Sequence, residues 1–245
     1  MYAIEVNNLN KIYTSLSGEM PVVQDLSFKI DTGSVFGFLG PNGAGKTTTI
    51  KMMVGLAMPT SGEIKIMDES PKSINLRRRI GFMPENSAFY LYLTGKEFMQ
   101  FVADIFGLSG QDKNKRIDAL LKEVNLYDAR NLQIRKYSKG MAQRLGLAQA
   151  LINDPEVIFL DEPLDGLDPL GRAEAKELLL KLKKQGKTIF FNSHILADVE
   201  DICDQVGIID KGRLVAYGSV QEVQGDFDTL EAAFVALIRK QRANN

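Results

Sequence analysis

The stretch GPNGAGKTT at residues 40–48 constrains this chain more than any other. An apolar run at 35–39 predicts a buried strand before it, and residues 47 to about 56 predict a helix after it. Glycines at this spacing let successive backbone N–H groups turn toward one anion, and the helix N-terminus adds its positive dipole end. A strand, such a loop and a helix in this order predict a site for the polyphosphate of a nucleoside triphosphate.

The residues of this loop have distinct expected roles. We expect Lys46 to reach the outer phosphates and Thr47 to offer its hydroxyl to Mg²⁺. The loop residues that we expect to contact the nucleotide are Gly40, Asn42, Gly43, Ala44, Gly45, Lys46, Thr47 and Thr48.

Two acidic residues follow the apolar run at 157–160, which is typical of a central parallel strand. Asp161 ends that strand, where we expect it to hold Mg²⁺, usually through water. Its neighbour Glu162 lies where a carboxylate can orient and deprotonate a water that attacks the γ-phosphate. His194, the single histidine, comes just past a further apolar strand, on the edge where open α/β sheets bind ligands. We therefore predict Glu162 and His194 as catalytic residues.

The remaining pattern predicts an α/β fold, which a chain of 245 residues could build as one large domain or two small ones. Alternating residues at 4–9 and 26–30 predict half-buried antiparallel strands. Apolar residues at helical spacing after a capping box of Thr94 and Glu97 predict a helical insertion. Within 1–245 we place a core with a mixed or parallel sheet and an antiparallel β subdomain at about 1–86 and 154–220, an inserted α-helical subdomain at about 87–153, and a C-terminal helix and tail at about 221–245, frayed from 240.

The composition argues against several classes of function. A formal net charge of −1 gives no general attraction to nucleic acid or anionic lipid. The single cysteine, Cys203, allows no intramolecular disulfide, which fits a reducing cytoplasm. No apolar run approaches the ~18 residues that a membrane-spanning helix needs, so any span would belong to another chain.

Two aromatic features allow alternative interpretations. Residues 88–93 (AFYLYL) would be a partner site if they were exposed, and a packed loop if they were not. Tyr13, which we place between the early strands, could stack on a base or cover the core. Its spacing alone favours the core.

The order of these features resembles that of the ATP-binding subunits of ABC transporters, across nearly the whole chain. YSKGMAQR at 137–144 resembles the ABC signature, commonly Leu-Ser-Gly-Gly-Gln, and DEPLDGLDP at 161–169 resembles the combined Walker B motif and D-loop. The resemblance implies a P-loop NTPase fold, a single nucleotide-binding domain over 1–245, and an ATPase that uses ATP and Mg²⁺. The residue roles that it implies are nucleotide contacts from Tyr13, Ser138, Gly140 and Asp168, a switch role for His194, and a metal contact from Glu85.

The resemblance also implies partners. Two copies of the chain would pair head to tail, with each ATP between the phosphate loop of one and the signature helix of the other. Separately encoded transmembrane permease subunits would contact the Glu85 loop and the aromatic segment after it. The chain would then work as a peripheral subunit on the cytoplasmic face of a membrane, for export by analogy with the branch that it resembles.

The chain departs from the commonest family pattern at a few positions. Lys139 replaces a glycine and Met141 a glutamine of the signature, and both changes occur in exporter-like branches. Glu85 stands where most members have a glutamine, and Asp165 where a serine is common. Because Ser138 and Gly140 remain, we expect the signature to function.

Three other functions use similar parts. A soluble ABC-type ATPase acting on DNA or ribosomes usually carries a coiled coil or a second nucleotide domain, and the sequence has no basic stripe for nucleic acid. A GTPase or small-molecule kinase would leave the signature segment unexplained, and the guanine-reading Asn-Lys-x-Asp is missing from the sequence. An ATP-gated binding module without turnover would not need Glu162 and His194.

Overall fold

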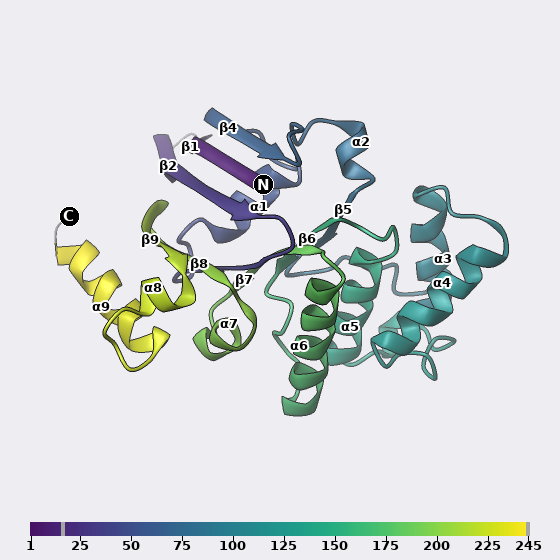
Figure 1. The fold of residues 1–245 in the computed structure, drawn as a ribbon. Coiled ribbons are helices and arrows are strands. Elements are labelled where there is room, and N and C mark those ends of the chain that lie inside the picture. The colour runs from purple at the N-terminus through teal and green to yellow at the C-terminus, as the bar shows by residue number, and fades with distance from the viewer. Residues whose placement is uncertain (16–17, 244–245) are drawn as a thin grey trace.

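The computed structural model describes residues 1–15 and 18–243, in which an antiparallel sheet lies above a mixed sheet in the view of Figure 1. The antiparallel sheet has the order β2-β1-β4, from β1 (Tyr2–Ser15), β2 (Gly18–Asp31) and β4 (Ser61–Ile66). Ile4 and Val6 of β1 are fully buried, as the alternation predicts. Our prediction that Tyr13 lies between the early strands is wrong. Tyr13 lies within β1, where it pairs with Met20 of β2.

The mixed sheet has the order β5-β6-β7-β3-β8-β9, and only its last pair is antiparallel. Its strands are β3 (Val35–Leu39), β5 (Ile80–Met83), β6 (Val157–Asp161), β7 (Thr188–Ser193), β8 (Gln205–Asp210) and β9 (Arg213–Ser219). Burial on both faces explains the apolar runs from which we predicted its central strands. Because β3, β6 and β7 run parallel, their carboxyl ends reach one edge, where the phosphate loop, Asp161 and Ser193 lie.

The two faces of the mixed sheet pack against different partners. Aromatic rings fill the space toward the antiparallel sheet, where Phe28 stacks on Phe36 with centroids 5.4 Å apart and Phe36 contacts Phe190 at the same distance. Helices α5, α6 and α7 cover the opposite face (Figure 1), with aliphatic side chains such as Leu145 fully buried. Each such side chain contributes roughly 1.5–3 kcal/mol on burial, so both faces fix the sheet firmly.

Helices α3, α4 and α5 come between β5 and β6 in the chain; α3 and α4 form the lobe at the right of Figure 1, and α5 lies beside α6. The helices are α1 (Lys46–Met53), α2 (Ile74–Arg77), α3 (Gly95–Ile105), α4 (Gly110–Glu123), the 3₁₀ turn η1 (Ile134–Lys136), α5 (Lys139–Ala150), α6 (Pro169–Lys184), α7 (Leu196–Ile202), α8 (Val220–Gln224) and α9 (Leu230–Ala243). The capping box of Thr94 and Glu97 starts α3, as predicted. Helix α1 stops earlier than we expected, because Gly55 adopts a φ of 74° just beyond it.

The C-terminal part holds two helices, α8 and α9, where we predicted one. Residues 240–243 continue α9 instead of fraying, because Arg242 donates to both carboxylate oxygens of Asp210, at 3.0 and 3.1 Å. Residues 244–245 of the expected tail lie outside the described residues. In the part of the chain that the structure describes, no helix has both the length and the apolar character needed to cross a bilayer.

Candidate nucleotide site

In the loop between β3 and α1, a Cβ would clash with the backbone of another segment at two glycine positions. Gly45 has a φ of 109°, and a Cβ there would lie 2.7 Å from the carbonyl oxygen of Val22. A Cβ on Gly40 would lie 2.3 Å from the carbonyl oxygen of Ile209. No side chain caps the start of α1, so its first N–H groups meet no competing side-chain acceptor. The loop is therefore shaped to receive an anion at a helix N-terminus.

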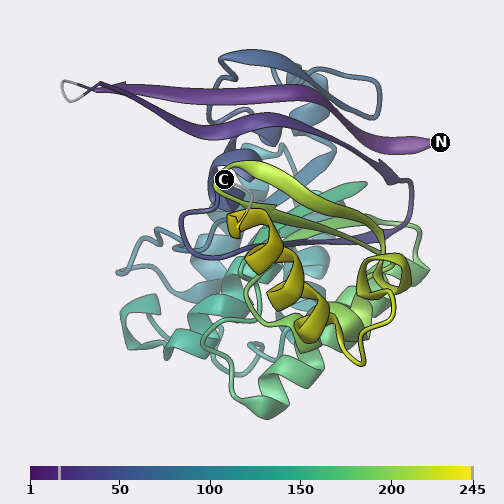
Figure 2. The same ribbon diagram turned by 90° about the vertical axis from the view of Figure 1, so that its left-hand side faces the viewer.

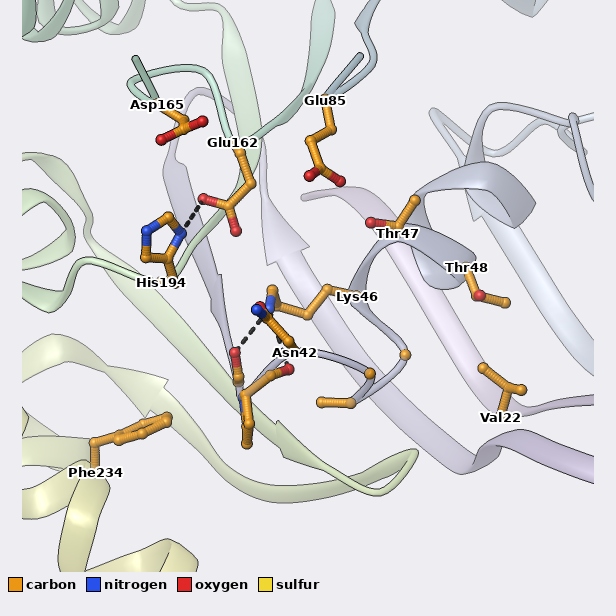
Figure 3. A pocket seen from close by; sticks show the side chains of 15 residues that line it. Val22, Asn42, Lys46, Thr47, Thr48, Glu85, Glu162, Asp165, His194 and Phe234 are labelled. Atoms are coloured by element: carbon orange, nitrogen blue, oxygen red, sulfur yellow. Dashed lines mark hydrogen bonds and ion pairs between the residues drawn. The ribbon is translucent and has the colours of Figure 1, made fainter. Parts of the chain in front are cut away.

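This loop borders a cavity of about 610 Å³, a volume typical of small-ligand sites. Residues 40–48 all line it, together with Glu85, Glu162, Asp165 and His194. Figure 3 shows Glu85, Glu162 and His194 reaching from different elements into the space above the loop. The structure thus brings the predicted phosphate loop and the predicted catalytic pair into one site.

Lys46 is the cation at the centre of the cavity. It is buried, and its Nζ donates to the carbonyl oxygens of Gly40, at 2.7 Å, and Pro41, at 3.3 Å. Burial lowers the pKa of Lys46, against the opposing effect of nearby carboxylates, foremost Glu162. Neutral carbonyls compensate an ammonium only partly, so a polyphosphate would be a better partner for it.

The carboxyl end of β6 places the two acids differently. Asp161 is buried, and its Oδ1 accepts a hydrogen bond of 2.7 Å from Asn192 Nδ2. Glu162 turns into the cavity, and its Oε2 lies 2.9 Å from Nδ1 of His194 (Figure 3). A carboxylate held by a histidine beside a phosphate site can accept a proton from water, which is the chemistry that the sequence predicts.

The oxygen groups near the loop suit Mg²⁺. The described residues hold no cluster of three His, Cys, Asp or Glu side chains around one point. Mg²⁺ does not need one, because it takes one or two carboxylates and completes its shell with phosphate and water. Thr47 and Glu85 both line the cavity, and buried Asp161, outside that lining, ends β6, the neighbour of the strand that precedes Glu85. These residues fit the ion that we predicted for them.

Comparisons with known proteins agree with this geometry. The family model described as ABC transporter matches residues 23–165. The chain belongs to the ABC transporter family. An uncharacterized ABC transporter ATP-binding protein from Synechocystis is 45% identical over 93% of this chain and 66% of its own length. A bacitracin transport ATP-binding protein from Bacillus licheniformis is 42% identical over 86% of this chain and 68% of its own. The chain thus spans about two thirds of the length of these relatives.

A solved ATP-binding subunit of an ABC transporter has the same architecture, with a TM-score of 0.87 and 32% identity over 96% of this chain and 99% of that one. The α/β fold with an antiparallel sheet and a helical insertion is therefore confirmed, as is the predicted family. At the level of this module, the chain is an ABC-type ATPase.

Several residues that the ABC resemblance assigns to the nucleotide do not line the cavity of this one subunit. Ser138 is exposed at the start of α5, where its Oγ accepts a hydrogen bond from the N–H of Met141. Asp168 caps α6 by accepting one from the N–H of Gly171. Tyr13 is 39% exposed, with Lys11 Nζ 4.7 Å above its ring centre. The nucleotide contacts of these residues, and of Gly140, stay predictions.

The cavity also includes residues that we did not predict for this ABC site. Asp165 lines it and accepts a 2.7 Å hydrogen bond from Lys139, which lowers the pKa of Asp165. Val22 of β2 and Phe234 of α9 line it as well. The departure at Asp165 was a signal that could have drawn attention to it. Nothing in the local sequence distinguishes Val22 or Phe234 from core residues.

Proposed function

We propose that this chain works as a homodimeric, Mg²⁺-dependent ATPase that drives separately encoded transmembrane permease subunits from the cytoplasmic face of a membrane. The observation that carries this proposal is the division of the nucleotide site. One part, the cavity around Lys46, is formed within the chain, whereas Ser138 lies exposed at the start of another helix. A second copy is the simplest way to unite them.

In the proposed reaction the phosphate loop and Lys46 hold the triphosphate of ATP. Glu162 accepts a proton from a water as its oxygen bonds to the γ-phosphorus, and the bond to the leaving oxygen of ADP breaks. His194 holds the Glu162 carboxylate in place. Thr47, Asp161 and Glu85 would hold Mg²⁺, which neutralises negative charge on the phosphates when bound.

Gly140 supports the pairing of two copies. It lies in α5 without a positive φ, and a Cβ there would come no closer than 3.6 Å to another residue of the chain. Glycine in a helix costs about 1 kcal/mol relative to alanine, and the chain itself gives no reason for that cost. Close approach of a neighbour's phosphate to the α5 backbone would supply the reason.

The aromatic segment after Glu85 supports contact with a membrane partner. Tyr90, Leu91 and Tyr92 are 60%, 53% and 77% exposed, and Phe101 and Ile105 of α3 are exposed as well. Large apolar side chains gathered on a surface mark an interaction site. We assign it to a segment of the permease subunit. Photo-crosslinkers at residues 85–93 should capture that subunit, and crosslinks formed only elsewhere would refute this assignment.

We infer export from the departures at Lys139 and Met141, which the chain shares with exporter-like branches. We also propose that the adenine ring of ATP stacks on Tyr13.

The test of the catalytic assignment is the variant Glu162→Gln. It should bind ATP as the parent does, while phosphate release falls about 10²- to 10⁴-fold. Parental turnover would remove Glu162 as the base.

A further inference from the structure

Two contacts tie the beginning of α5 to the loop that carries Glu162. The side-chain amide of Gln143 donates a 2.8 Å hydrogen bond to the backbone carbonyl of Glu162. One helical turn earlier, the ammonium of Lys139 donates a 2.7 Å hydrogen bond to the carboxylate of Asp165. The first contact is between the backbone of the proposed base and a helix of the segment inserted between β5 and β6.

The backbone of Glu162 needs external support. Its φ is 55°, in the left-handed region that is unfavourable for a residue with a Cβ. Its carbonyl accepts from Gln143 and from the N–H of Asp165, at 3.2 Å. Gln143 is 8% exposed, so little water can replace its amide. The conformation that sends the Glu162 carboxylate toward His194 is therefore stabilised from α5.

The second contact joins two of the departures noted in the sequence. Lys139 lies in the first turn of α5, where the helix dipole disfavours a cation, and Asp165 supplies the compensating charge. The Lys139 stem lies directly over Gly166, because a Cβ there would come within 2.5 Å of Lys139 Cε. The lysine and the aspartate thus form one matched pair rather than two separate changes.

We propose that Gln143 and Lys139 clamp residues 162–166 to α5, and that Gln143 is a positioning residue for Glu162. The proposal rests on the proposed role of Glu162 as the base. Ser138, the N-cap residue of α5, is also the residue that would meet the neighbouring copy's triphosphate. A movement of α5 on that contact is therefore transmitted to the Glu162 carboxylate in the chain's own cavity.

The variants Gln143→Leu and Gln143→Glu test the first contact, with Gln149→Leu as the matched control on the same helix. We expect Gln143→Leu to lower kcat at least about tenfold with ATP affinity within about twofold of the parent, because only the catalytic geometry changes. Gln149→Leu should leave both unchanged. A parental kcat in Gln143→Leu would overturn the clamp.

The variant Gln143→Glu adds a readout that a purely structural role would not give. A carboxyl group donates a hydrogen bond only when protonated, and burial raises its pKa. Its kcat relative to the parent should therefore be higher at pH 6 than at pH 8. A pH-independent ratio would overturn the proposal, and this measurement remains decisive if Gln143→Leu fails to fold.

Parallel assays of Glu162→Gln separate the two proposals. If Glu162→Gln retains turnover, the assignment of the base fails. If Glu162→Gln is inactive while Gln143→Leu keeps the parental rate, the base stands and the clamp fails.

A double-mutant cycle tests the second contact. Lys139→Gly and Asp165→Ser should each lower kcat about threefold or more, because each leaves one charge without its partner. The double variant should recover to within about twofold of the parent, since coupled residues are not additive. Additive losses in the double variant would overturn the ionic half of the clamp.

Discussion

The helix starts at α1 and α5 are both assigned to phosphate binding, yet they are built in opposite ways. Helix α1 follows the N-cap residue Gly45, has no side-chain cap and borders the cavity beside Lys46. Helix α5 follows the exposed N-cap residue Ser138, whose hydroxyl accepts a hydrogen bond from the N–H of Met141. The first start is prepared for an anion within its own chain, whereas the second is stable on the surface until a neighbour approaches.

The glycines of the two helix starts differ in the same way. Gly45 is required by its own chain, through a φ of 109° and a close carbonyl, whereas Gly140 has room for a methyl group. Because nothing within the chain requires a glycine at position 140, we attribute this glycine to contact with another molecule. Variants at the two starts should therefore affect different properties, and these differences can be measured.

The largest effect should come from Lys46→Ala, which removes the cation of the phosphate loop at the start of α1. We expect ATP affinity measured by calorimetry to fall at least about 100-fold, because a buried charge-assisted contact with phosphate is lost. Unchanged affinity would contradict the assignment of the phosphate loop.

Ser138→Ala should spare ATP affinity of the single subunit and lower kcat, by roughly tenfold or more, since a donor near the reacting phosphate is removed. Ser219→Ala is the matched control, because Ser219 caps α8 with the same 3.2 Å contact and lies outside the cavity lining. Both should lose about 1 kcal/mol of stability through the missing cap. Equal kcat values in the two variants would show that Ser138 only caps α5 and has no role in the reaction.

The paired glycine substitutions should change stability in opposite directions. Gly45→Ala should destabilise the fold by about 1–3 kcal/mol, because it forces a Cβ into a left-handed backbone. Gly140→Ala should stabilise it by about 0.5–1 kcal/mol in denaturant unfolding and still weaken ATP-dependent association. Undiminished association in Gly140→Ala would show that the glycine serves no close approach.

The smallest effect concerns pH. The hydrogen bond from Lys139 lowers the pKa of Asp165, so this group adds stability above its unfolded pKa of about 3.8. That contribution disappears as pH falls through the lower pKa of the folded state. It should stay below about 1 kcal/mol because the pair is exposed, and Lys139→Gly should remove it in acid unfolding curves. If Lys139→Gly lost stability at low pH in the same way as the unsubstituted protein, the pairing would be contradicted.

The sequence allowed prediction where chemistry fixes local spacing. Gly40 to Thr48, the acids at 161 and 162, and His194 each follow a strand, and parallel strands bring those ends together. The family and fold predicted from these motifs are confirmed. The position of Tyr13 was predicted wrongly, because the strand pattern does not reveal how far the β1–β2 hairpin extends (Figure 2).

Contacts between distant segments could not be predicted. Gln143 and Glu162 are 19 residues apart, and their contact depends on how α5 packs beside the loop after β6. The departures at Lys139 and Asp165 were visible in the sequence, but their pairing required the three-dimensional arrangement. The same holds for Phe234, which reaches the cavity from the C-terminal helix.

The most direct test of the divided nucleotide site is the mass of Glu162→Gln in solution, measured by light scattering with and without ATP and Mg²⁺. Because this variant hydrolyses ATP slowly, bound ATP should hold the phosphate loop before α1 of one copy against the start of α5 of another. The account predicts a single chain's mass without ATP and twice that mass with it, and reversal by Ser138→Ala. A single chain's mass at saturating ATP would contradict the account.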